Sequence, residues 1–123
     1  MIHLDTCVLV DALTGPRRSA PALRALIEDG ERISFSALVL YEWLRGPRDA
    51  EELRVQEALF PGSEASPFGR AEAALASDLY RLVRRRRGRE LDLAIAASAI
   101  SHDAALWTLN RRDFTDIPRL RLR

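Results

Sequence analysis

Lysine is absent from this chain, and all 19 of its basic residues are arginine. Without a lysine amine, the chain has no side chain for a Schiff base or for a P-loop that grips phosphate through lysine. Arginine still binds phosphate well, because its planar guanidinium matches phosphate geometry with paired donors. The missing residue therefore excludes two kinds of chemistry and leaves nucleic-acid binding open.

Cysteine and histidine are almost as scarce, since the chain has one cysteine, Cys7, and two histidines, His3 and His102. A single cysteine excludes an internal disulfide and a cysteine-based zinc cage. Two histidines are too few for a histidine-rich metal site. Together these shortages argue against metal sites of the cysteine-rich and histidine-rich kinds.

Long apolar runs are also missing, and none approaches the roughly 20 residues that a membrane-spanning helix needs. The first residues lack the charged, apolar and cleavage regions of a signal peptide. We therefore expect a cytoplasmic protein with no membrane partner. At 123 residues, of which 47% are apolar, the chain is most simply one domain, residues 1–123, with a core of ordinary composition.

The net charge of +1 conceals an uneven distribution along the chain. Residues 1–78 carry 8 arginines against 13 acidic residues, a balance of −5, whereas residues 79–123 carry 11 against 5, a balance of +6. The densest stretch is the run Arg84–Arg87, with Arg81 and Arg89 beside it. Such a run is either a solvated helix end, where cations complement the helix dipole, or a surface that binds the RNA backbone.

Short apolar segments alternate with helical patterns along the chain. The expected strands are Ile2–Leu4, Arg32–Phe35, Ala105–Leu109 and Leu120–Leu122, and Ser63–Pro67 is either a short strand or a loop. The expected helices are Val8–Leu13, one from Ser19 or Ala20 to Gly30, Ala37–Arg45 capped by Ser36, one opened by a capping box of Asp49 and Glu52, Ala71–Arg87, and Leu91–His102. This alternation predicts βαβ units, and hence a three-layer α/β/α sandwich with a short, mainly parallel central sheet.

Asp5 directly follows the first expected strand. A carboxylate at that end of a buried strand is costly unless it is paired or binds a cation. In open parallel sheets, ligands also bind at the carboxyl ends of the strands. The alternative is that Asp5 only caps the helix that follows, as aspartates often do.

Three later carboxylates have similar positions, and each has an ordinary alternative role. Glu42 lies in an apolar helix just after the second strand, where it could pair with Arg45. Asp92 opens an alanine-rich helix, where it could be the N-cap. Asp113 follows the strand Ala105–Leu109, where it could be a turn residue.

A parallel sheet would bring these four positions to one edge. Four oxygen donors without histidine or cysteine suit a hard cation such as Mg²⁺ or Mn²⁺. Such a cation can bind the oxygens of a phosphodiester and activate water. Arg111 and Arg112 lie beside Asp113 and are better candidates for phosphate contact than the run Arg84–Arg87.

Five short motifs follow one another along nearly the whole chain. They are Leu4-Asp5-Thr6, Glu42 with Leu44 and Gly46, Asp92 with Ile95-Ala96-Ala97, Thr108-x-Asn110-x-x-Asp113-Phe114, and Ile117-Pro118-x-Leu120. In this order and spacing they resemble the motifs of PIN domains, and specifically those of the VapC-type ribonuclease toxins of bacterial toxin–antitoxin pairs. The combination is specific to that family, although no single motif is.

The resemblance implies a PIN-like fold and a Mg²⁺- or Mn²⁺-dependent endoribonuclease. It implies RNA as the substrate, a homodimer, and neutralisation by a small VapB-like antitoxin. The residues that it implies are the metal-binding, catalytic carboxylates Asp5, Glu42, Asp92 and Asp113, and the supporting polar residues Thr6 and Asn110.

One position departs from the family pattern, since Cys7 stands where the family usually has asparagine or serine. This departure bears on a local hydrogen bond and not on the metal site. Two alternative functions remain open at this stage: a catalytically silent PIN-like module that binds RNA or protein, and a DNA-cleaving or flap-type nuclease. The complete set of four carboxylates argues against the first, and the short chain without inserted arches argues against the second.

Overall fold

A parallel sheet of three short strands forms the centre of the structure, a computed structural model that describes all 123 residues. Its strands are β1 (Ile2–Leu4), β2 (Ile33–Ser34) and β3 (Ala105–Trp107), in the order β2-β1-β3. Ile2 pairs with Ile33 on one side and with Ala105 on the other. Because β1 is the central strand, the residue that follows it emerges in the middle of the sheet's carboxyl edge.

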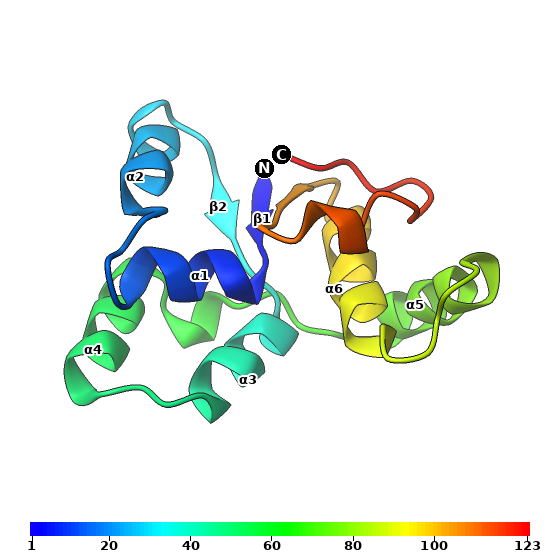
Figure 1. Cartoon of the computed structure of the whole chain (residues 1–123), viewed down its shortest axis with the longest axis horizontal. Helices are drawn as coiled ribbons and strands as arrows, with labels where there is room; N and C mark the ends of the chain where they lie inside the picture. The colour runs from blue at the N-terminus through cyan, green and yellow to red at the C-terminus, as the bar shows by residue number, and fades with distance from the viewer.

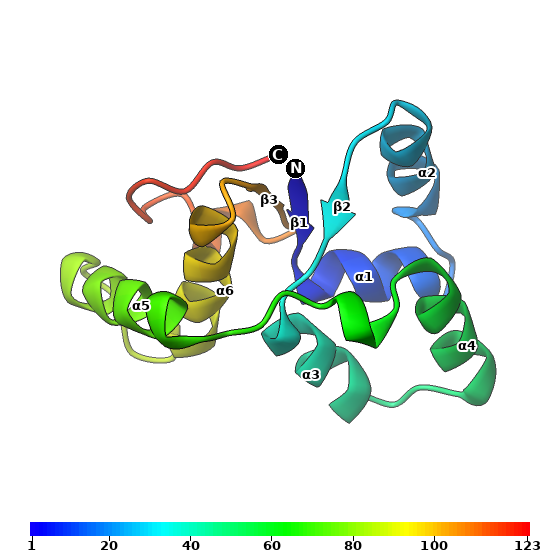
Figure 2. The same cartoon turned by 180° about the vertical axis from the view of Figure 1, so that it is seen from behind.

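Six α-helices surround this sheet in two groups (Figure 1). Helices α1 to α4 lie on one side of the strands, and α5 and α6 lie on the other, as the view from behind also shows (Figure 2). The helices are α1 (Thr6–Leu13), α2 (Ala20–Glu28), α3 (Ala37–Arg45), α4 (Ala50–Leu59), α5 (Arg70–Leu82) and α6 (Glu90–Ser101), with 3₁₀ turns at Gly62–Glu64 and Arg111–Asp113. The predicted α/β/α architecture is confirmed.

Two predicted helix starts are confirmed, each by a local cap, whereas α1 begins at Thr6 after the Asp5 cap and not at Val8 as predicted. The Ser36 hydroxyl accepts a hydrogen bond from the Val39 N–H at 3.2 Å, which starts α3. Asp49 and Glu52 form the predicted capping box of α4, with bonds of 2.8 and 2.9 Å. Gly30 follows α2 with φ +83°, a conformation that glycine adopts without the steric cost of a Cβ.

The end of α5 differs from the prediction. A helix was expected to continue to Arg87, but α5 ends at Leu82, and Val83 is extended and buried. A helix through residues 84–87 would stack like charges on one another one turn apart, which destabilises it. Burial of Val83 in the core then favours the extended conformation.

The last expected strand is also not formed as predicted. Leu120–Leu122 contributes one isolated parallel bridge, between Leu122 and Leu106, and β3 ends at Trp107 instead of Leu109. The ambiguous stretch Ser63–Pro67 includes the end of a 3₁₀ turn and one bridge, from Ser66 to Ser36. The sheet is thus shorter than expected, and the carboxyl side of β3 is a loop that can carry polar side chains.

The hydrophobic core lies between the sheet and the helices on both sides. Trp43 of α3 and Leu4 of β1 are fully buried in it, and so are the alanines Ala96, Ala97 and Ala99 of α6. These small side chains let α6 lie close to its neighbours, which places the start of α6 beside the carboxyl edge of the sheet. None of the helices has the length and apolar character needed to cross a membrane.

Candidate active site

Asp5 follows the central strand and is held from both sides of its carboxylate. Its Oδ1 accepts a hydrogen bond from the Thr6 N–H at 2.9 Å, as the N-cap of α1. Its Oδ2 accepts one from the Thr108 hydroxyl at 2.7 Å and one from the Cys7 thiol at 3.4 Å. Asp5 is only 5% exposed, yet it lines a cavity. It is therefore both a helix cap and a fixed carboxylate at the surface of a cavity.

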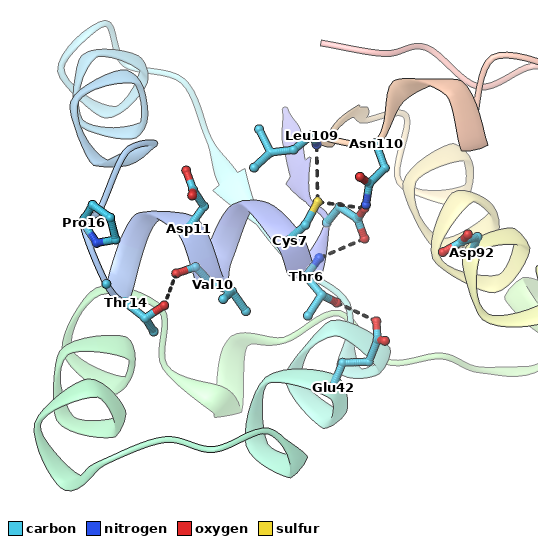
Figure 3. A pocket seen from close by; sticks show the side chains of 12 residues that line it. Thr6, Cys7, Val10, Asp11, Thr14, Pro16, Glu42, Asp92, Leu109 and Asn110 are labelled. Atoms are coloured by element: carbon cyan, nitrogen blue, oxygen red, sulfur yellow. Dashed lines mark hydrogen bonds between the residues drawn. The ribbon is translucent and has the colours of Figure 1, made fainter.

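Glu42 reaches the same cavity from α3. The Thr6 hydroxyl donates a hydrogen bond to Glu42 Oε1 at 2.6 Å, which links the start of α1 to α3 (Figure 3). The other oxygen of Glu42 lies 3.5 Å from the exposed guanidinium of Arg45. This ion pair is long and solvated, so it contributes little stability. The expected pairing with Arg45 exists, but the shorter bond holds Glu42 beside Asp5.

Asp92 is the third residue of α6 and not its N-cap, which is Arg89. No hydrogen bond contributes to the pKa of its carboxyl group, which depends on burial and on neighbouring charges. The pKa of Asp92 is raised to about 6, first by burial and then by the negative charges of Asp5, Asp113 and Glu42, while the positive charge of Arg89 opposes the rise. The capping role considered for Asp92 is therefore wrong. Its carboxylate is instead half-buried among other acids.

The cavity that these three carboxylates line has a volume of about 480 Å³ and is open to solvent. Its polar lining comes from different elements, and Figure 3 shows Thr6 at the start of α1, Glu42 on α3 and Asp92 on α6. The polar residues around it include Asp5, Thr6, Cys7, Glu42, Asp92 and Asn110. The structure thus brings together three of the four predicted carboxylates and both predicted supporting residues.

Asp113 lies in the 3₁₀ turn after β3 and lines a second cavity, of about 690 Å³, together with Arg111 and Arg112. Leu109 and Asn110 line both cavities, so the two adjoin. Asp113 is exposed, but it is close enough to contribute to the raised pKa of Asp92. The fourth carboxylate therefore stands at the edge of the acidic cavity and not inside it.

The donor set fits a hydrated hard cation. All the candidate ligands are oxygens, and Asp92 has no hydrogen-bond donor of its own to balance its charge. No three acidic, histidine or cysteine side chains are close enough together to hold one ion directly. Mg²⁺ commonly keeps several waters and binds through one or two carboxylates. These residues therefore fit such an ion without forming a closed cage of protein ligands.

Two residues that contact Asp5 were not among the predicted site residues. Thr108 is buried, donates to Asp5 and accepts a hydrogen bond from the Asn110 N–H at 3.0 Å. Cys7 Sγ accepts a hydrogen bond from the Leu109 N–H at 3.3 Å. Burial and the charge of Asp5 raise the pKa of the Cys7 thiol, which keeps its proton available for donation. Thr108 falls in the expected strand Ala105–Leu109, which pairs with β1 in the parallel sheet, and this position was the signal that could have identified it.

The arrangement of a short parallel sheet with acidic residues at its carboxyl edge corresponds to a known class. A family model described as PIN domain matches residues 2–120, so the chain belongs to the PIN domain family. It is 38% identical to ribonuclease VapC19 of Mycobacterium tuberculosis over 122 residues, which cover 95% of this chain and 94% of the relative. The family resemblance predicted from the motifs is confirmed.

Solved structures agree with this assignment. The chain resembles VapBC2 from Rickettsia felis bound to a promoter DNA fragment, with a TM-score of 0.77 and 25% identity over 100% of this chain and 98% of the other. It also resembles DNA-bound VapBC from Salmonella typhimurium, with a TM-score of 0.82 and 20% identity over 99% and 96% of the two chains. The second match concerns the fold alone.

Proposed function

We propose that this protein is a VapC-type toxin that cleaves RNA as a Mg²⁺- or Mn²⁺-dependent endoribonuclease. The similarity to ribonuclease VapC19 along nearly the whole chain supports the reaction class. The observation that carries the proposal is the position of Asp92, a half-buried carboxylate without a cap hydrogen bond, in one cavity with Asp5 and Glu42. The end of β1 and the helices α3 and α6 place like charges together, which destabilises the fold unless a cation balances them.

Each residue of the site has a role in this proposal. A divalent cation supplies Lewis acidity and a bound water of lowered pKa for attack on a phosphodiester. Asp5, Glu42 and Asp92 would hold the hydrated cation, directly or through its bound waters, and Asp113 would act through such a water from the edge of the cavity. Thr6 orients Glu42 through its 2.6 Å hydrogen bond. Asn110 lies where the two cavities meet and would contact the RNA there.

Arg111 and Arg112 are proposed to contact RNA phosphates beside Asp113. Both line the second cavity. Arg111 also donates a hydrogen bond to the Arg123 carbonyl at 2.7 Å, which holds the C-terminal residue, so part of its role is structural. Arg112 has no such bond and is the more available of the two.

The proposed partners follow from the solved relatives. Rickettsia felis VapBC2 is a complex, which supports a VapB-like antitoxin as the partner of this chain. A homodimer and a cytoplasmic location remain predictions from the sequence. The competing candidate is a silent PIN-like module that uses the acidic cavity for binding only.

The test is cleavage of purified bacterial RNA with Mg²⁺, with Mn²⁺ and with EDTA. We expect cleavage with either cation, none in EDTA, and none from Asp5→Asn in any condition. Glu28→Gln, which removes a charge from the exposed side of α2, is the matched control and should cleave normally. Cleavage that persists in EDTA or in Asp5→Asn would contradict the proposal.

A thermal scan separates the silent module from an enzyme that lacks its target RNA. Mn²⁺ should raise the melting temperature of the wild type, because an ion that binds only the folded state stabilises it. Asp5→Asn should abolish this rise. Absence of both cleavage and the Mn²⁺ effect would exclude the metal-dependent enzyme.

A further inference from the structure

The second cavity is the most basic concavity beside the candidate active site. It has a volume of about 690 Å³ and shares Leu109 and Asn110 with the acidic cavity. Its charged lining consists of Arg85, Arg89, Arg111, Arg112, Asp113 and Asp116. Four arginines against two aspartates make it a cavity suited to an anion.

Arg89 builds this cavity instead of serving as its ligand. Its two terminal nitrogens donate to both carboxylate oxygens of Asp116, at 2.8 and 2.6 Å. They also donate to the backbone carbonyl of Arg85 at 2.8 Å and to that of Asp113 at 2.7 Å. Both terminal nitrogens of the guanidinium thus have acceptors, while Nε has none, and the guanidinium fixes the loop of residues 83–88 against the 3₁₀ turn after β3.

Two guanidiniums of the cavity have no acceptor in the structure. In Arg85 and Arg112 the backbone carbonyl accepts a side-chain hydrogen bond, from Arg89 and Thr115 respectively, whereas the guanidinium makes none. Arg85 comes from the loop of residues 83–88 and Arg112 from the 3₁₀ turn, which are the two segments that Arg89 joins. Because Arg89 already balances Asp116, these side chains leave an excess of positive charge in the cavity.

Arg85 differs from the other members of the arginine run. Arg84 and Arg87 are exposed and do not line this cavity. The guanidinium of Arg86 lies over the Tyr80 ring, 5.5 Å from its centroid, on α5. The two interpretations of the run therefore apply to different residues: most of it is solvated, and one residue faces the cavity.

We propose that Arg85 and Arg112 together bind a backbone phosphate of the RNA strand next to the phosphate that is cleaved. This inference rests on the proposed function. A guanidinium matches phosphate geometry with paired, charge-assisted hydrogen bonds, and two of them from different segments define one phosphate position. Since the cavities meet at Asn110, a strand with one phosphate in the acidic cavity continues into the basic one.

The experiment measures binding of a fluorescein-labelled, 12-nucleotide single-stranded RNA of mixed sequence in EDTA, where cleavage is absent. Arg85→Ala and Arg112→Ala are compared with Arg84→Ala and Arg87→Ala, which remove the same charge from the loop that carries Arg85. For each lost phosphate contact on a single strand, the log–log salt slope should fall in magnitude by about 0.7. Between 50 and 200 mM salt, a variant that lacks one contact should therefore lose about 2.6-fold less affinity than the wild type loses.

We expect this change in Arg85→Ala and Arg112→Ala but not in the two controls. Equal slopes for Arg85→Ala and Arg84→Ala would show diffuse attraction and overturn the proposal. A loss of binding to a glutamate-rich 12-residue peptide, with RNA binding unchanged, would also overturn it and assign the cavity to a protein partner.

Cleavage assays separate this proposal from the proposed function. If Arg85→Ala binds RNA like the wild type and Mn²⁺-dependent cleavage persists, only the phosphate site is wrong. If the wild type shows no metal-dependent cleavage, the proposed function fails, and the salt slopes still report whether these arginines bind phosphate.

Discussion

At the residue scale, the orientation of Asp5 depends on a hydrogen bond between distant parts of the chain. The Thr108 hydroxyl donates to Asp5 Oδ2 from 103 residues away, at the end of the neighbouring strand. The same hydroxyl accepts the Asn110 N–H, so it joins a candidate ligand to the boundary between the two cavities. Thr108 is thus a positioning residue, which acts on a cation through Asp5.

Thr108→Val should weaken Mn²⁺ binding by about tenfold, the lower end of the usual effect of losing a hydrogen bond to a metal ligand. It should also lower the free energy of unfolding in EDTA by about 1–3 kcal/mol, because buried polar groups lose their partner. Thr108→Ser keeps the hydroxyl and should restore Mn²⁺ affinity. The measurement is the Mn²⁺ dependence of the melting temperature, with urea unfolding in EDTA beside it.

A purely structural role for Thr108 would give a different pattern. Thr108→Val would then lose stability in EDTA but keep the Mn²⁺ affinity of the wild type. Equal affinities in the valine and serine variants would contradict the positioning role.

At the element scale, α6 places an acid where the metal-free fold is destabilised. The pKa of Asp92 is raised to about 6 in the folded protein, against 3.8 for the ordinary group. Between these two values the folded state binds more protons than the unfolded state, so stability falls as pH rises through this window. The loss of stability is fully present above the pKa of Asp92 in the folded protein, about 6, and is absent below its ordinary pKa of 3.8.

Asp92→Asn should therefore be more stable than the wild type in EDTA at pH 7.5 and about equal to it at pH 4. We expect a gain of about 1 kcal/mol, since solvent screening at a half-exposed carboxyl reduces the effect of its pKa shift. Glu90→Gln is the control from the same helical turn, and its exposed side chain makes no hydrogen bond or ion pair with the site. Loss of its favourable interaction with the helix dipole should cost about 0.3–1 kcal/mol.

Urea unfolding of both variants across this pH range measures the difference. RNA cleavage with Mn²⁺ is measured beside it and should vanish in Asp92→Asn alone. If Asp92→Asn cleaves RNA normally, or is less stable than the wild type at pH 7.5, then Asp92 is not part of the site.

The elements that could be predicted from the sequence are those with local boundaries. Helix α3 spans the predicted residues Ala37–Arg45 because Ser36 and Gly46 bound it locally. The end of α5 could not be predicted from helical periodicity, since burial of Val83 in the core fixes it. The start of α6 follows Arg89, whose guanidinium bonds to Asp116, 27 residues further along the chain.

In the candidate site, too, some positions could be predicted from the sequence and others depend on tertiary contacts. The positions of Asp5 and Glu42 followed from strand ends and helix order, which the chain encodes locally. The separation of Asp113 into a second cavity depends on the 3₁₀ turn and on the hydrogen bond from Arg89 to its carbonyl. The contact of Thr108 with Asp5 is a tertiary one, for which the spacing along the chain gives no local rule.

At the scale of the whole molecule, opposite charges occupy adjoining cavities. The acidic cavity takes most of its carboxylates from the first half of the chain, and the basic cavity lies entirely within residues 85–116. An RNA strand across both is attracted by one cavity and repelled by the other when no cation is bound. The carboxylates should therefore weaken RNA binding in EDTA.

Asp92→Asn should bind single-stranded RNA about twofold more tightly than the wild type in EDTA at low salt. A unit charge about 7 Å from a phosphate contributes roughly 0.6 kcal/mol in water, and salt reduces this further.

Glu28→Gln makes the same change in net charge on α2, away from α6 (Figure 1), and should leave the affinity unchanged. Fluorescence anisotropy at 20 and 200 mM salt measures both variants, and the difference should shrink at the higher concentration as the Debye length falls below about 8 Å. Equal tightening in both variants would mean that RNA responds to net charge alone, and then the boundary between the cavities would not lie on the path of the strand.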